Sequence, residues 1–162
     1  MRRSLRSTLL SSLFVLVLAV VVLGGVLVQR SVSTNASGPA VGTKEVFPPP
    51  WCTWGANEEF HLLHGYYVPW TTNSTAYQWP DRARQFGWQV HIKAVNGDIV
   101  AMQPWVQGAY ASGHVAVVVK VYSNGSVDAS TTAWGSNFWV RHIIHIYQGH
   151  GILFIHRLPI IA

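Results

Sequence analysis

An uncharged apolar run near the N-terminus separates a short basic tip from the rest of the chain. It extends for twenty residues from Leu9 to Val28 and follows Arg2, Arg3 and Arg6. A helix of that length spans a bilayer core, and the arginines before it favour a cytoplasmic N-terminus. A cleaved secretory signal is the alternative, although such signals have shorter cores of about 7–15 residues. We therefore expect a single-pass membrane protein, or a secreted one if the segment is cleaved, with everything after Arg30 outside the cytoplasm.

Composition then predicts three segments: a basic tip and anchor over residues 1–30, a tether over 31–50 and a folded domain over 51–162. The tether is rich in Ser, Gly, Thr and Pro and ends in three prolines, as linkers do. About 110 residues follow, which is enough for one small core.

The net positive charge of the chain comes mostly from its N-terminus. Four of the eleven basic residues belong to the first segment, so seven basic residues stand against six acids in the rest of the chain, which is nearly neutral. Because the remaining Lys and Arg do not cluster, a nucleic-acid partner is not expected.

The domain is expected to have an α+β fold, with helices at its start and an antiparallel sheet after them. The proline run and Gly65 bound a predicted helix over 52–64, whose inward side chains would be Ala56, Phe60 and Leu63. A shorter helix is predicted over 75–86. Runs of Val, Ile and aromatic residues separated by Gly, Asn and Ser predict strands over 98–102, 114–122, 126–132, 138–147 and 151–157.

Cys52 is the only cysteine in the chain. In an exported protein such a thiol is an inert core residue, an intermolecular disulfide partner or a free reactive group. Its predicted place at a helix N-terminus favours the reactive group, because the free N–H groups and the helix dipole there stabilise a thiolate. The same N–H groups can hold the oxyanion that forms when a thiolate attacks a carbonyl.

A nucleophile of this kind needs a base, and the chain has eight histidines. His114 opens the apolar run "SGHVAVVVKV", where a sheet can hold its ring in place. His61 and His64 lie three apart on the predicted helix and could share a metal, but two ligands make a weak zinc site. We therefore expect His114 to be the base and expect no metal.

Five stretches follow one another within about residues 50–157: "CTWGAN", "AYQWPDRARQFGW", "NGDIVAMQP", "SGHVAVVVKV" and "NGSV". In this order they resemble the cysteine- and histidine-dependent amidohydrolase/peptidase domains, called CHAP domains. The resemblance implies a papain-like fold in which Cys52 is the nucleophile and His114 the general base. It also implies cleavage of amide bonds in peptidoglycan, between glycan and stem peptide or within the peptides, without a cofactor. Some members bind calcium, but Glu58 and Glu59 point in different directions on a helix, so we expect no calcium site.

The residues that orient the histidine are different here. The family has a glutamate after its hairpin and an asparagine two residues later, whereas this chain has Thr131 and Ala133. Thr131 and Asn137 are the candidates to orient His114, and neither carries a charge. A serine triad that loses this anion loses about four orders of magnitude in rate, but a cysteine is intrinsically more nucleophilic and should lose less.

The face on which Thr131 lies follows from the hairpin register. Asn124-Gly125 is typical of a two-residue turn, which would pair Val118 with Thr131 and put Thr131 on the same face of the sheet as His114. Asp128 has the opposite parity and is expected to point away from the histidine.

The sequence therefore predicts a membrane-anchored, extracytoplasmic cysteine amidase or endopeptidase that acts on peptidoglycan. The alternative is a catalytically degenerate CHAP-like module that binds wall or assists assembly without cutting, and a disulfide-linked dimer through Cys52 is a lesser third. Trp51 and Trp54 flank the thiol and are expected to shape the substrate groove, whereas Trp79 and Trp88 are expected to pack in the core.

Overall fold

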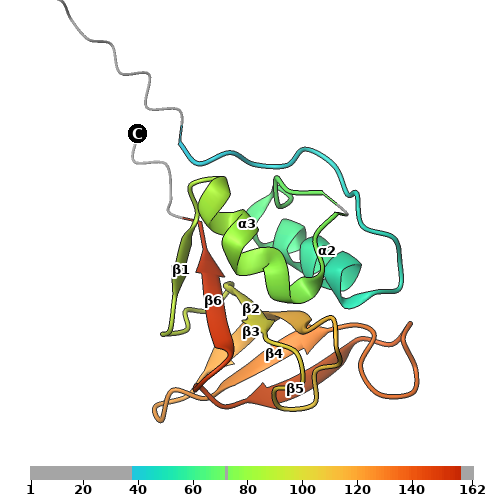
Figure 1. Ribbon diagram of the computed structural model, residues 1–162, viewed down its shortest axis with the longest axis vertical. Coiled ribbons are helices and arrows are strands. Elements are labelled where there is room, and N and C mark those ends of the chain that lie inside the picture. Colours follow the sequence, from blue (N-terminus) through green and yellow to red (C-terminus); the bar gives the residue numbers. More distant parts are fainter. Residues whose placement is uncertain (1–37, 72, 158–162) are drawn as a thin grey trace, which may run out of the picture. The chain divides into compact units, whose positions relative to one another are not determined.

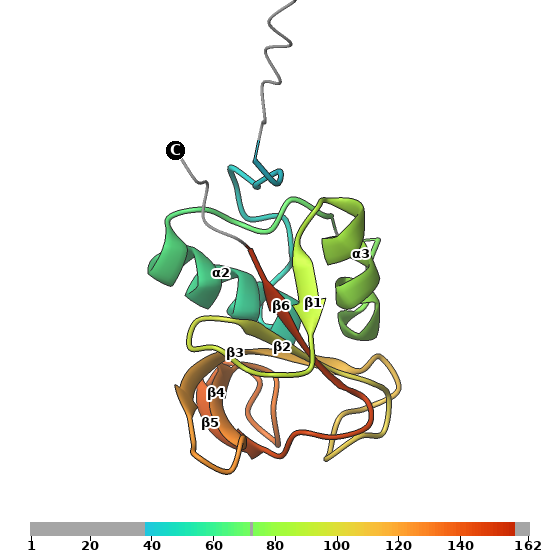
Figure 2. The ribbon, with the colours of Figure 1, turned by 90° about the vertical axis from the view of Figure 1, so that its left-hand side faces the viewer.

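Six antiparallel strands form one sheet in the order β1-β6-β2-β3-β4-β5 (Figure 1). The computed structural model describes residues 38–71 and 73–157. The strands are β1 (Gln89–His91), β2 (Ile99–Met102), β3 (His114–Val121), β4 (Val127–Thr131), β5 (His142–Ile146) and β6 (Ile152–His156), and the helices are α2 (Cys52–His64), the short 3₁₀ helix η1 (Ala76–Gln78) and α3 (Trp79–Gln85). Helices α2 and α3 pack against one core with side chains of β2, β3 and β6, and in Figure 2 they appear on either side of β1 and β6.

The central strands are buried on both faces. Val115 and Val117 of β3 belong to the core beneath α2 and α3, and Ala116 and Val118 belong to a second core shared with β4 and β5. This explains the unbroken apolar run of β3, because a strand with one solvated face would alternate with polar residues. The expected α+β architecture, with helices packed on an antiparallel sheet, is confirmed.

The first helix has the predicted bounds, and Gly65 ends it with a φ of 79°. Ala56 and Phe60 are buried as expected, but Leu63 is 54% exposed, so its inward assignment was wrong. The buried polar residue Asn57 lies in the helix instead, and its side chain accepts the backbone N–H of Val68 at 2.9 Å.

The remaining elements differ from prediction at their ends. The helix expected over 75–86 is divided between η1 and α3, with Pro80 in the first turn of α3. Residues 138–141 form a loop before β5 rather than part of the strand, and β1 was not predicted. Trp79 and Trp88 pack in the core, as expected.

Part of the predicted tether belongs to the folded domain. Phe47 is 4% exposed in the core beneath the helices, and Gly42 forms a β-bridge with Tyr67. A boundary at residue 50 is therefore too late, because Phe47, which precedes the three prolines, already packs in the core. No helix within 38–71 and 73–157 is long and apolar enough to cross a membrane. The predicted anchor, residues 9–28, lies outside the described residues.

The hairpin between β3 and β4 departs from its predicted register twice. Its loop contains three residues, 123–125, rather than two, and a β-bulge follows Val118, which pairs with Ala129 instead of Thr131. Each change shifts the register by one residue, and two such shifts together preserve which residues share a face. Thr131 and His114 accordingly lie on one face, as predicted.

Candidate active site

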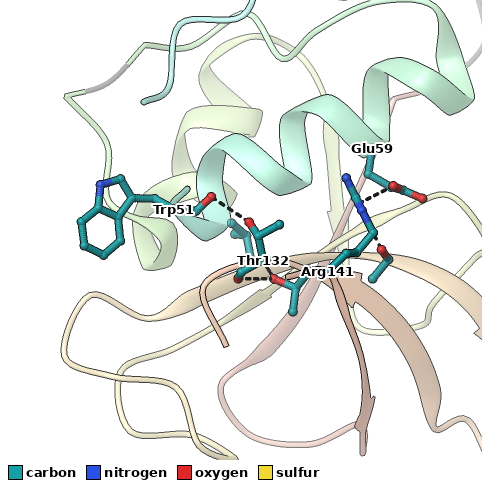
Figure 3. Close-up of polar contacts among 7 residues, drawn as sticks. Trp51, Glu59, Thr132 and Arg141 are labelled. Carbon is teal, nitrogen blue, oxygen red and sulfur yellow. Dashed lines mark hydrogen bonds and ion pairs between the residues drawn. The ribbon is translucent and has the colours of Figure 1, made fainter. Parts of the chain in front are cut away.

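The start of helix α2 is fixed by the backbone carbonyl of Trp51, which accepts two hydrogen bonds. The N–H of Gly55 donates at 3.0 Å, as the first bond of the helix, and the Thr132 hydroxyl donates at 3.0 Å from the end of β4 (Figure 3). Cys52 is the next residue, so this bond across 81 residues of sequence positions the thiol against the sheet.

A second link holds α2 about two turns further on. Arg141 forms an ion pair with Glu59 of the helix, and its Nη1 also donates to Ser130 Oγ at 3.1 Å (Figure 3). Glu59 is therefore engaged with an arginine, and its neighbour Glu58 accepts the Tyr67 hydroxyl at 3.4 Å.

Helix and sheet approach closely at Gly55. A Cβ on this residue would lie 2.1 Å from Thr132 Oγ1 and 2.8 Å from its Cγ2, well inside van der Waals contact. Glycine is therefore required here by the close approach of the helix to β4 and not by backbone conformation.

Cys52 opens onto a cavity of about 440 Å³, a size that suits small ligands. Trp51 lines this cavity and is 51% exposed, as expected for a groove residue. Trp54 is not among the described residues that line this cavity, and it is partly buried against the core beneath the helices. Cys52 itself is half-buried.

Burial raises the pKa of the Cys52 thiol above its usual value, and backbone hydrogen bonds with Val115, Thr53 and Cys52 itself lower the pKa but do not cancel the rise. The helix N-terminus therefore acts in the expected direction, yet desolvation outweighs it. The expectation of a thiolate in the resting protein is corrected: Cys52 is a neutral thiol at neutral pH.

His114 begins β3, directly after Gly113. A Cβ on Gly113 would lie 2.5 Å from the carbonyl oxygen of Met102 on the neighbouring strand, so only glycine fits before the histidine. The imidazole is 4% exposed and packs edge-on against Trp134, with ring centroids 4.7 Å apart. Burial lowers the pKa of His114 to about 4, so the ring is neutral at neutral pH.

Thr131 holds one nitrogen of this ring. His114 Nε2 lies 2.8 Å from Thr131 Oγ1, whose hydroxyl donates to the carbonyl oxygen of Val115 at 3.0 Å or of Thr132 at 3.1 Å. Because these carbonyls accept the only hydroxyl proton, Oγ1 accepts from Nε2–H. The neutral ring then carries its proton on Nε2 and has a free lone pair on Nδ1, the form that a general base needs.

Cys52 lies against Val115, the residue that follows His114 in β3. Cys52 packs against the core that contains Val115, and a backbone hydrogen bond with Val115 lowers the pKa of the thiol. Within residues 38–71 and 73–157, no hydrogen bond joins the Cys52 sulfur to His114.

The other candidate partners of His114 are engaged elsewhere. The side chain of Asn137 accepts the backbone N–H of Trp139 at 3.2 Å. Asp128 accepts the Tyr122 hydroxyl at 2.7 Å and lies 2.8 Å from His145, on the opposite side of β4 from His114, as its parity predicted.

The histidines weighed as zinc ligands have structural contacts. His61 stacks on Tyr67 with centroids 4.0 Å apart, and His64 Nε2 lies 3.0 Å from the carbonyl oxygen of Gly97. Among the described residues, no group of three or more His, Cys, Asp or Glu side chains is arranged to hold a metal ion.

A sequence model of one protein family, the CHAP domain, matches residues 44–133, more than half of the chain. This chain belongs to the CHAP family. The match includes Cys52, His114 and Thr131, and it ends at Ala133. No curated protein matches the chain in sequence.

Two solved structures resemble this CHAP chain. An N-acetylmuramoyl-L-alanine amidase from Staphylococcus aureus is 21% identical, with a TM-score of 0.62, over 79% of this chain and 37% of that one. The shared fold is thus established, although this chain spans little more than a third of the amidase. A structure of Ly7917 with the hydrolyzing product of MDP is 14% identical over 73% of this chain and 55% of that one, with a TM-score of 0.48.

Proposed function

We propose that this chain is a cysteine-dependent peptidoglycan hydrolase that cleaves an amide bond, between glycan and stem peptide or within the peptide. The observation that carries the proposal is the Cys52 thiol on an open cavity, together with His114 Nε2 lying 2.8 Å from Thr131 Oγ1. Membership of the CHAP family supports the same chemistry. We place the reaction outside the cytoplasm, where residues 9–28 tether the domain or are removed on export.

The proposed reaction balances with one water. His114 Nδ1 takes the thiol proton, and the Cys52 sulfur adds to the amide carbonyl while a backbone N–H of the helix start stabilises the oxyanion. His114 then protonates the leaving amine as the C–N bond breaks, which leaves a thioester. Water attacks the thioester, gives its proton to His114 and releases a carboxylic acid, and the proton returns to the thiol.

Mass spectrometry of fragments released from purified cell walls tests this function. Amide hydrolysis adds one water and creates a new amine and a new carboxyl group, and the fragments identify which bond was cut.

The pH dependence of the rate tests the role of His114. Because the imidazole is neutral above its pKa of about 4, kcat/KM should decrease on the acid side of its pH profile with a midpoint near pH 4, rather than near the ordinary histidine value of about 6.5.

The second candidate is a non-catalytic wall-binding module. Two features favour it: the position of the family's glutamate is Thr131, and the pKa of the buried Cys52 thiol is raised. Such a module would be pulled down by wall material without releasing any fragment.

Thr131→Val is expected to lower kcat by about 10-fold to 100-fold and to leave KM nearly unchanged, because it removes the acceptor of Nε2–H and frees the wrong tautomer. Valine has almost the same shape as threonine, so packing is preserved, and Thr131→Ser, which keeps the hydroxyl, is the matched control. The measurement is the rate of fragment release against substrate concentration. A kcat for Thr131→Val equal to that of Thr131→Ser would remove Thr131 from the mechanism.

A further inference from the structure

None of the described residues that line the cavity beside Cys52 carries a formal charge. Its hydroxyl-bearing residues are Thr53, Ser74, Thr75 and Ser112, and the other described residues that line it are apolar or aromatic apart from the thiol. Hydroxyls can donate to or accept from a neutral polar group, but they do not neutralise a carboxylate.

The reactive groups do not add a charge. Burial raises the pKa of the Cys52 thiol and lowers the pKa of His114 to about 4, so both are neutral at pH 7. The helix start supplies partial positive charge, but its N–H groups at Cys52 and Thr53 lie at the sulfur.

Neighbouring charges do not favour an anion either. Arg141, on the sheet side of α2, is paired with Glu59. Glu45 accepts the backbone N–H of the wall residue Phe47 at 2.6 Å and also the Asn57 amide, and burial raises the pKa of this carboxyl. A substrate carboxylate that entered the cavity would lose water and find no cation among the described residues that line it.

We infer that this cavity selects the uncharged form of the peptide beside the scissile bond, taking a stem peptide whose carboxyl group is amidated over the same peptide with a free carboxylate. This rests on the proposed function and names the substrate class of the same site. A carboxamide has both a donor and an acceptor for the wall hydroxyls and needs no counter-charge.

Binding tests the inference separately from catalysis. The Cys52→Ala chain is titrated calorimetrically with muramoyl peptides in pairs, in which each carboxyl group in turn is free or amidated. For the carboxyl that enters the cavity, the amidated member should bind about tenfold tighter or more. Equal affinity within every pair, or a preference for the free acid, would overturn the inference.

A charge placed on the wall should change the preference. Ser112 is an exposed wall residue, and Ser112→Lys puts a cation where none stands, so the preference should shift about tenfold towards the free acid. Ser123→Lys adds the same charge in the exposed hairpin loop, which does not line the cavity, and should leave the preference unchanged. An unaltered preference in Ser112→Lys would also overturn the inference.

Failure of the two ideas can be distinguished. If the wild-type chain releases wall fragments but neither binding nor rate differs within the pairs, the hydrolase stands and the selectivity is wrong. If no fragment is released but the amidated peptides bind tighter, the selectivity stands and the site belongs to a binding module.

Discussion

Cys52→Ala should abolish release of wall fragments, lowering the rate by about 10⁴-fold or more. The reaction proposed above has no other nucleophile, because Cys52 is the only cysteine in the chain and the only thiol on the cavity. Alanine keeps the helix start and the cavity, so binding to wall material should persist. Release of soluble fragments, followed by absorbance and mass spectrometry, is the measurement.

Cys52→Ser is the informative control. It retains the shape of the site and a hydroxyl in place of the thiol, but a buried imidazole whose pKa is about 4 is too weak a base to activate an alcohol. Serine should therefore be nearly as inactive as alanine. Equal clearing of wall by the wild type and Cys52→Ala would falsify the cysteine mechanism.

Gly55→Ala should lower the free energy of unfolding by about 3 kcal/mol, from overpacking and loss of the Thr132 hydrogen bond. Helix propensity alone predicts the opposite, since alanine is favoured over glycine by about 1 kcal/mol in a helix interior. The contact decides the sign, because the added Cβ would lie 2.1 Å from Thr132 Oγ1. Urea unfolding followed by circular dichroism measures the change.

Two companions make this test specific. Gly149→Ala adds the same methyl group where no atom lies within 4 Å, and it should change stability little. Thr132→Gly removes all three atoms that the new Cβ would meet, so in the double variant Gly55→Ala should cost much less than it does alone. Additive effects of the two substitutions would show that the helix and β4 are not in contact here.

The parts of the fold that could be predicted are those with local signals. Three prolines and Gly65 bound helix α2, and the apolar run after His114 gave β3. Strand β1 was missed because it has only three residues, two of them polar, with no alternation to recognise. Leu63 was placed inward because the helical period was continued into the last turn, where the helix has passed the edge of the core.

In the site, the residue types were predictable but their protonation states were not. A helix N-terminus is visible in the sequence and lowers the pKa of a thiol, whereas burial of the Cys52 sulfur is a property of the folded chain and has the larger effect. The hydrogen bond from the Thr132 hydroxyl to the Trp51 carbonyl joins residues far apart in sequence, so no local sequence pattern predicts it.

The three-residue loop and the bulge in the β3–β4 hairpin constrain how this part of the chain can change length. Deleting one residue from the loop alone would rotate β4 so that Thr132 met the imidazole and Thr131 faced helix α2. The histidine would exchange one threonine for another, but the helix would lose the hydroxyl that anchors its first carbonyl. Insertions and deletions in this hairpin are therefore tolerable only in even numbers, or when a second irregularity restores the original facing of both threonines.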